Sequence, residues 1–175
     1  GAKIGLAALP IFIGSLFKKA YAQSGPSQNA VLDILNYALT LEYLEAEFYA
    51  MGIAKGTALV PAGAPAAAIK TIGDHEAAHV EFLKTAISAS GGTPVSKPTF
   101  DFTAGGTFAD VFTSYGTFLA VAQTFEDTGV RAYKGRAAEI TGGGDLLTAA
   151  LNIHSVEARH AAHIRSMRKA NGFGD

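Results

Sequence analysis

Two Glu-x-x-His motifs are the residues of this chain best suited to chemistry. They are Glu76-Ala77-Ala78-His79 and Glu157-Ala158-Arg159-His160, and each lies in an Ala-rich run with helical periodicity. Residues three apart lie on the same face of a helix, so each motif directs a carboxylate and an imidazole towards one point. Two such pairs, together with a lone glutamate from each of two other helices, could enclose a pair of metal ions.

An internal repeat supplies the lone glutamates. Glu42 is followed seven residues later by Tyr49, and Glu126 is followed seven residues later by Tyr133. One Glu-x-x-His motif follows each of these pairs along the chain. Every one of these glutamates falls on the apolar stripe of its predicted helix, where a carboxylate is costly unless it is paired or bound to a metal. Facing carboxylates of this kind need cations to balance their charge.

Four long helices are predicted to position these side chains. We expect them at about residues 27–54, 65–90, 107–139 and 145–170, with glycine-containing breaks between them. The connection at 91–106 contains two prolines and is long enough to cross a helical bundle from end to end. Within it, Thr99–Phe102 is expected to pack two aromatic rings on the bundle. No segment alternates clearly enough to predict a strand, so the fold class is an all-α four-helix bundle with a long crossover between its second and third helices.

Composition excludes several classes of function. Hydrophobic residues make up 49% of the chain and charged residues 17%, which is too apolar for a disordered protein. A formal net charge of -1 gives no indication of a nucleic-acid partner. The absence of cysteine excludes disulfides, thiolate metal sites and iron–sulfur clusters, so any metal must be held by histidine and carboxylate ligands.

The N-terminal segment is distinct from the rest. In residues 1–24 an apolar run from Ile4 to Phe17 precedes Lys18-Lys19 and the small-x-small pattern Ala20-Tyr21-Ala22. This pattern is typical of the latter part of a secretory signal peptide, and it predicts an exported protein: periplasmic, cell-surface or extracellular. Alternatively, the segment is retained as an apolar arm that docks on neighbouring subunits of a homo-oligomer or on a membrane. We therefore divide the chain into this segment and a bundle domain at 25–175.

The motifs resemble a known family. The phrases LEYLEAEFY (41–49) and FEDTGVRAY (125–133), with the two Glu-x-x-His motifs, are similar to the ferritin-like di-metal carboxylate proteins, which include ferritins, bacterioferritins, rubrerythrins and manganese catalases. With its leader, the chain looks most like the exported ferritin-like domain family. The resemblance covers about residues 27–170, and it implies a ferritin-like four-helix bundle.

The resemblance also implies a dinuclear metal site. In it Glu76 and Glu157 would bridge the ions, Glu42 and Glu126 would each bind one ion, and the two histidines, His79 and His160, would give one nitrogen each. Ligands of this type suit iron first and manganese next, with zinc as an unselective competitor. The implied chemistry is Fe(II) oxidation or reaction with dioxygen or peroxide, with no catalytic residues beyond the metal ligands; whether the protein is an enzyme stays open.

Several further residues lie near the predicted site. Tyr49 and Tyr133 are expected either as hydrogen-bond partners of the ligands or as core. Glu45, one turn from Glu42, is a seventh ligand, a hydrogen-bond acceptor beside the ligands or a solvated side chain, and we favour the second. His154 is a candidate partner of the ligands, although an ordinary helix-face role is the simpler interpretation for it and for the other two extra histidines, His75 and His163. Asp74 and Asp127 are hypothesised to hold ligand imidazoles from a neighbouring helix.

Two other classes of function stay open. In one, the bundle is the building block of a structural, self-assembling protein, an oligomer or a filament, and the N-terminal segment makes the contacts. In the other, an exported binding module takes a small ligand in an apolar cavity.

Overall fold

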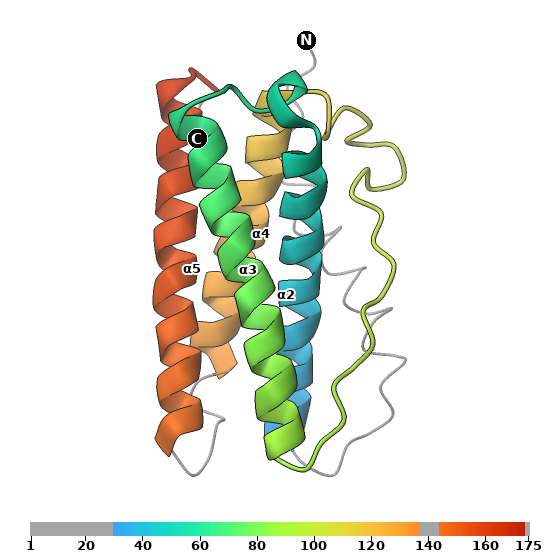
Figure 1. The fold of residues 1–175 in the computed structure, drawn as a ribbon, viewed down its shortest axis with the longest axis vertical. Helices are drawn as coiled ribbons and strands as arrows, with labels where there is room; N and C mark the ends of the chain where they lie inside the picture. Colours follow the sequence, from blue (N-terminus) through green and yellow to red (C-terminus); the bar gives the residue numbers. More distant parts are fainter. Residues whose placement is uncertain (1–29, 137–143, 174–175) are drawn as a thin grey trace.

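The computed structural model describes residues 30–136 and 144–173. Most of this part is helical: α2 (Ala30–Ala54), a short 3-10 helix η2 (Gly56–Ala58), α3 (Ala64–Ala89), α4 (Tyr115–Arg136) and α5 (Gly144–Ala170). The four long helices lie side by side along the longest axis of the molecule (Figure 1), and the described residues contain no strand. The prediction of an all-α four-helix bundle is confirmed.

The N-terminal segment, residues 1–24, lies outside the described residues. Its roles as a leader, an assembly arm or a membrane contact therefore stay predictions, and so do export and the division into two regions. Within 30–136 and 144–173, no helix is both long enough and apolar enough to span a membrane.

The crossover between α3 and α4 runs along the outside of the bundle from one end to the other (Figure 1). It begins where α3 ends, at Gly91, which has a positive φ of 78°, and the N–H of Gly92 donates to the Ile87 carbonyl at 2.9 Å. Asn36 of α2 then holds the crossover, because its side-chain oxygen accepts the Val95 N–H at 2.8 Å. The predicted end-to-end crossing is confirmed.

The predicted start of the third helix, near Thr107, is wrong. Residues 102–113 form turns, and α4 begins only after Ser114, whose hydroxyl accepts the Thr117 N–H at 3.3 Å as an N-cap. The turns are fixed by Asp101, whose carboxylate accepts N–H groups from Thr103 and Gly105 at 2.9 and 2.8 Å. The predicted end, at 137–139, lies outside the described residues.

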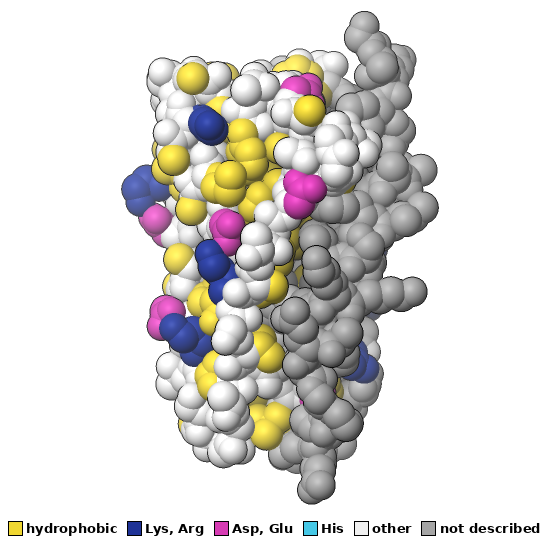
Figure 2. All heavy atoms as spheres, turned by 90° about the vertical axis from the view of Figure 1, so that its right-hand side faces the viewer, with side chains coloured by type: hydrophobic (Ala, Val, Ile, Leu, Met, Phe, Trp, Pro, Cys, Tyr) yellow, Lys and Arg dark blue, Asp and Glu magenta, His cyan; other side chains and the backbone are white. Residues whose placement is uncertain are grey.

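Apolar side chains of the crossover cover an aromatic cluster. Phe102 and Phe108 are buried, and Phe102 contacts Phe48 of α2 with ring centroids 5.4 Å apart. Phe100 packs against the same cluster, as predicted for this stretch. Figure 2 shows the face along which the crossover runs: hydrophobic side chains lie between charged ones, and no described histidine is visible there.

A polar layer separates two apolar clusters along the bundle. One cluster contains the aromatic rings, including Phe48, Phe118 and Phe125, and the other includes Leu39, Leu83 and Ile153. Between them, every long helix places a fully buried glutamate. The two clusters thus close the middle layer from both ends, which removes water from the residues that could do chemistry.

Candidate metal centre

The six predicted ligands come together in the polar layer. The carboxylate residues Glu42 of α2, Glu76 of α3, Glu126 of α4 and Glu157 of α5 are each 0% exposed. Their helices bring them inward because each glutamate replaces an apolar residue on the buried stripe, one or two turns from core side chains of the same helix.

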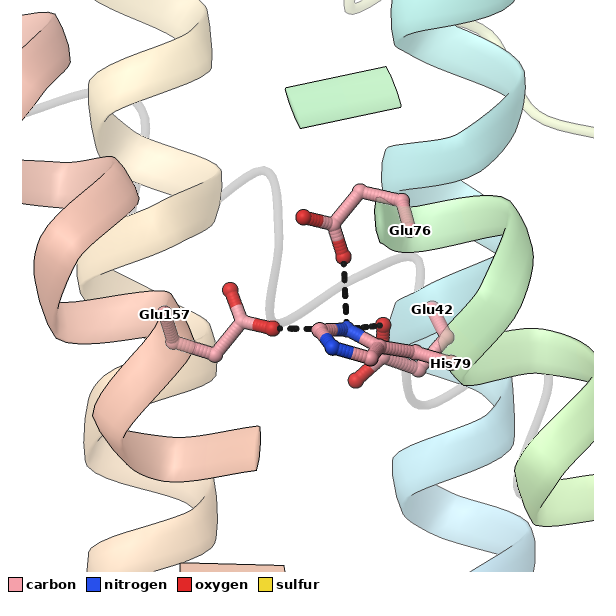
Figure 3. Close-up of side chains that lie close together, drawn as sticks. All are labelled: Glu42, Glu76, His79 and Glu157. Carbon is pink, nitrogen blue, oxygen red and sulfur yellow. Dashed lines mark hydrogen bonds and ion pairs between the residues drawn. The ribbon is translucent and has the colours of Figure 1, made fainter. Parts of the chain in front are cut away.

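The first group of ligand atoms surrounds Nδ1 of His79. This nitrogen lies 3.2 Å from Glu42 Oε2, 3.2 Å from Glu76 Oε2 and 3.2 Å from Glu157 Oε1. Figure 3 shows the three carboxylates converging on the imidazole from separate helices. One imidazole nitrogen and three carboxylate oxygens are a donor set that iron, manganese and zinc all accept.

The second group surrounds Nδ1 of His160. Here the distances are 2.8 Å to Glu76 Oε1, 3.3 Å to Glu126 Oε2 and 3.8 Å to Glu157 Oε2. Glu76 and Glu157 thus give one oxygen to each group, whereas Glu42 and Glu126 belong to one group each. In each group the four ligand atoms lie within 4.8 Å of one another. The arrangement could hold two cations that share two carboxylates.

Two tyrosines fix the unshared carboxylates, and they do so across the bundle. The Tyr133 hydroxyl of α4 donates to Glu42 Oε1 at 2.5 Å, and the Tyr49 hydroxyl of α2 donates to Glu126 Oε1 at 2.5 Å. Each tyrosine therefore engages the glutamate of the opposite helix and leaves Oε2 of that glutamate directed at a histidine. The expectation that these tyrosines are hydrogen-bond partners of the carboxylates describes both of them.

Comparison with known protein families agrees with the bundle and its layer of carboxylates and imidazoles. The family model described as ferritin-like domain matches residues 30–170. The chain belongs to the ferritin-like domain family. Neither the curated proteins nor the solved structures gave a match.

In this ferritin-like domain the buried carboxylates are not fully balanced by positively charged groups. Both oxygens of Glu157, Oε1 of Glu76, Oε2 of Glu126 and Nδ1 of His160 have no hydrogen-bond partner. Burial, followed by repulsion between carboxylates, raises the pKa of Glu76 and Glu126 well above the usual carboxyl range. Burial also raises the pKa of Glu157, although His79, whose Nδ1 lies 3.2 Å from Glu157 Oε1, opposes the shift. A carboxylate cluster with these properties is stabilised by bound protons or by cations.

The pKa values of the two imidazoles shift in opposite directions, although burial acts to lower both. For His79, the close contacts with the carboxylates of Glu157, Glu42 and Glu76 outweigh burial and raise the pKa to about 12. For His160, whose Nδ1 has no aligned acceptor, burial and repulsion from His75 and His79 lower the pKa to about 3. The carboxylates around Nδ1 of His79 thus favour its protonated form, whereas the surroundings of His160 favour its neutral form.

Glu45 is a fifth buried carboxylate beside the site. It is 1% exposed, and neither of its oxygens has a hydrogen-bond partner. It faces Gly129, the corresponding position of the repeat: a Cβ there would lie 3.4 Å from Glu45 Oε1 and 3.5 Å from Glu157 Oε2. The solvated alternative is therefore wrong, since the bundle encloses this side chain. The small residue at 129 leaves the room that its carboxylate occupies.

The two aspartates lie differently from their hypothesis, whereas His163 fits the helix-face interpretation. Asp74 pairs with Lys70 at 2.6 Å and Asp127 with Arg165 at 2.9 Å, so neither holds a ligand imidazole. His154 is partly buried, its Nδ1 makes no hydrogen bond, and its role beside the ligands stays a prediction. His163 is exposed.

His75 is the residue whose placement sequence reasoning missed. The sequence favours an ordinary helix-face role for His75, yet its Nδ1 lies 2.9 Å from Nε2 of His160. The available signal was its position directly before Glu76, which identifies no partner by itself.

Proposed function

We propose that this ferritin-like domain binds two iron or manganese ions and that the loaded centre reacts with dioxygen or a peroxide. One observation carries the proposal: two histidine nitrogens each face three carboxylate oxygens, and two glutamates contribute to both groups. Two divalent cations would balance the charge of the four buried carboxylates, which the imidazole of His79 balances only in part. Bound in the reduced state, such a pair supplies two electrons to an oxidant.

The protein's own part is to hold the ligands and to exclude water. Tyr133 and Tyr49 each occupy one oxygen of an unshared carboxylate, so that Glu42 and Glu126 offer their remaining oxygen in a fixed direction. The aromatic cluster around Phe48, on the side of α2's C-terminal half, keeps bulk water from the polar layer. Glu/His ligation without a thiolate favours iron or manganese through the donor set.

Metal uptake by the protein without bound metal tests the proposal. Anaerobic titration with Fe(II), and separately with Mn(II), should show saturation at two equivalents per chain. Substitution of either shared carboxylate, Glu76→Ala or Glu157→Ala, should abolish tight stoichiometric uptake because it removes a ligand from both groups. A matched control is Glu81→Ala, since Glu81 lies on α3 and forms an exposed pair with Lys84 at 2.8 Å.

Oxidation is tested on the loaded protein. Fe(II) bound at two equivalents should be oxidised by dioxygen or hydrogen peroxide faster than the same Fe(II) with the Glu76→Ala variant. Far-UV circular dichroism establishes that each variant remains helical. Unchanged uptake in both alanine variants would refute the metal assignment, and uptake without accelerated oxidation would refute the redox part alone.

A further inference from the structure

We propose that His75 is a positioning residue for His160, holding that imidazole so that its Nδ1 faces the second group of carboxylates. The inference rests on the proposed function, because it concerns how one of the two metal positions is built. It assigns a role to a residue outside the six ligands.

The geometry of the two rings carries the proposal. His75 of α3 and His160 of α5 are 85 positions apart, and Nδ1 of His75 lies 2.9 Å from Nε2 of His160. Their rings are nearly parallel, with an interplanar angle of 14° and centroids 5.2 Å apart. The other nitrogen of His160 lies 2.8 Å from Glu76 Oε1, so one edge of the ring faces the carboxylates while the opposite edge is held by His75.

The direction of the hydrogen bond between His160 and His75 follows from what a metal ligand must offer. Nδ1 of His160 can bind a cation only through its lone pair, so the proton of the neutral ring is on Nε2. That N–H then donates to Nδ1 of His75. Such a bond to the outer nitrogen fixes the orientation of a ligand imidazole and raises its donor strength.

The same support is missing at the other position. Among the described residues, no hydrogen bond is made to Nε2 of His79, and the residue that precedes Glu157 as His75 precedes Glu76 is Val156, which has no acceptor side chain. The aspartates that could have served are engaged with Lys70 and Arg165. The two metal positions should therefore be unequal, with the histidine fixed at one and not at the other.

A pair of substitutions separates hydrogen bonding from ring packing. His75→Phe keeps a flat ring beside His160 but removes the acceptor. His75→Asn removes the ring but places its amide oxygen, like Nδ1, on Cγ. His75 is exposed, so both variants should fold. The matched control is His163→Phe, an exposed histidine one turn beyond His160.

The measurement is stepwise Co(II) binding to metal-free protein, followed by calorimetry and by the visible absorption of the bound ion. His75→Phe should weaken one of the two binding steps about 10- to 100-fold and change the spectrum of that ion. His75→Asn should restore most of the affinity, and His163→Phe should leave both steps unchanged. In a His160→Ala background His75→Phe should have no further effect, whereas in a His79→Ala background it should keep its effect.

The outcomes separate this inference from the proposed function. Wild type that takes up two Co(II) ions, with both steps unaltered in His75→Phe, would overturn the positioning role and leave the metal centre intact. Equal losses in His75→Phe and His75→Asn would also overturn it, because the acceptor would then be irrelevant. Wild type that binds neither Co(II) nor, in parallel titrations, Fe(II) or Mn(II) would instead remove the proposed function on which the inference rests.

Discussion

Tyr133→Phe is expected to weaken metal binding in the group around His79 and to spare the group around His160. The substitution removes only the hydroxyl that donates to Glu42 Oε1 at 2.5 Å. Tyr133 and Glu42 are both buried, so no bulk water replaces the lost donor. The freed oxygen lets the carboxylate rotate, and Oε2 is no longer held towards Nδ1 of His79.

The magnitude follows from the type of bond. A hydrogen bond to a charged group contributes about 1.5–3 kcal/mol, and the buried position puts this one towards the upper part of that range. Since about 1.4 kcal/mol corresponds to a tenfold change in a binding constant, affinity at the first group should fall by about 10- to 100-fold. The second group should change by less than about threefold, because its carboxylate, Glu126, is held by Tyr49 instead.

Isothermal titration calorimetry of the metal-free protein with Mn(II) measures the affinity of both binding steps, one for each group of carboxylates. The reciprocal variant, Tyr49→Phe, should weaken the other step by a similar factor, and the double variant should weaken both. Tyr115→Phe is the control, since the Tyr115 hydroxyl is buried but has no hydrogen-bond partner. If both single variants bind two ions as tightly as Tyr115→Phe does, the tyrosines do not direct the carboxylates and this reasoning is wrong.

Two further predictions concern the stability of the metal-free protein. Burial, with repulsion from Glu157 and Glu126, raises the pKa of Glu45 well above 4.5, so the fold favours its protonated form and loses stability as pH rises. Thermal melts between about pH 5 and pH 8 should therefore show a falling melting temperature, and Glu45→Gln should make that fall shallower. Gly52→Ala should destabilise the fold by about 1–3 kcal/mol in urea unfolding, because its Cβ would clash with the buried Phe118 ring. Gly135→Ala, with nothing within 4 Å of its Cβ, should instead stabilise α4 by up to about 1 kcal/mol.

The six residues of the carboxylate and imidazole layer could be predicted because their spacing is a property of the helix alone. Glu-x-x-His places both side chains on one face whatever the helix packs against, and the repeated order identified the two lone glutamates. The ends of α2 and α3 were predicted closely, since Lys55-Gly56 and Gly91-Gly92 stop a helix locally. The start of α4 was not, because Phe108, Val111 and Phe112 pack on the bundle from turns, and their spacing resembles that of a helix.

Contacts between helices were the part that spacing did not determine. The sequence pairs Tyr49 with Glu42 along one helix, but the hydrogen bond runs to Glu126 on another. His75 likewise has its partner on α5, and the two imidazoles meet because α3 and α5 lie side by side in the bundle. Three possibilities stood for Glu45, and enclosure by the bundle removed one of them.

The crossed tyrosine bonds have a consequence for how the molecule is held together. α2 packs mainly on α3 and α4 mainly on α5, so the domain consists of two hairpins, and the carboxylate layer lies on the seam between them. Without cations, repulsion between carboxylates across that seam works against closure. The two tyrosine hydroxyls oppose it between α2 and α4, and the His79–Glu157 and His75–His160 contacts oppose it between α3 and α5. Metal binding by residues of both hairpins would hold the two hairpins together. Slower amide hydrogen exchange along the facing sides of α2 and α4 would then report that closure.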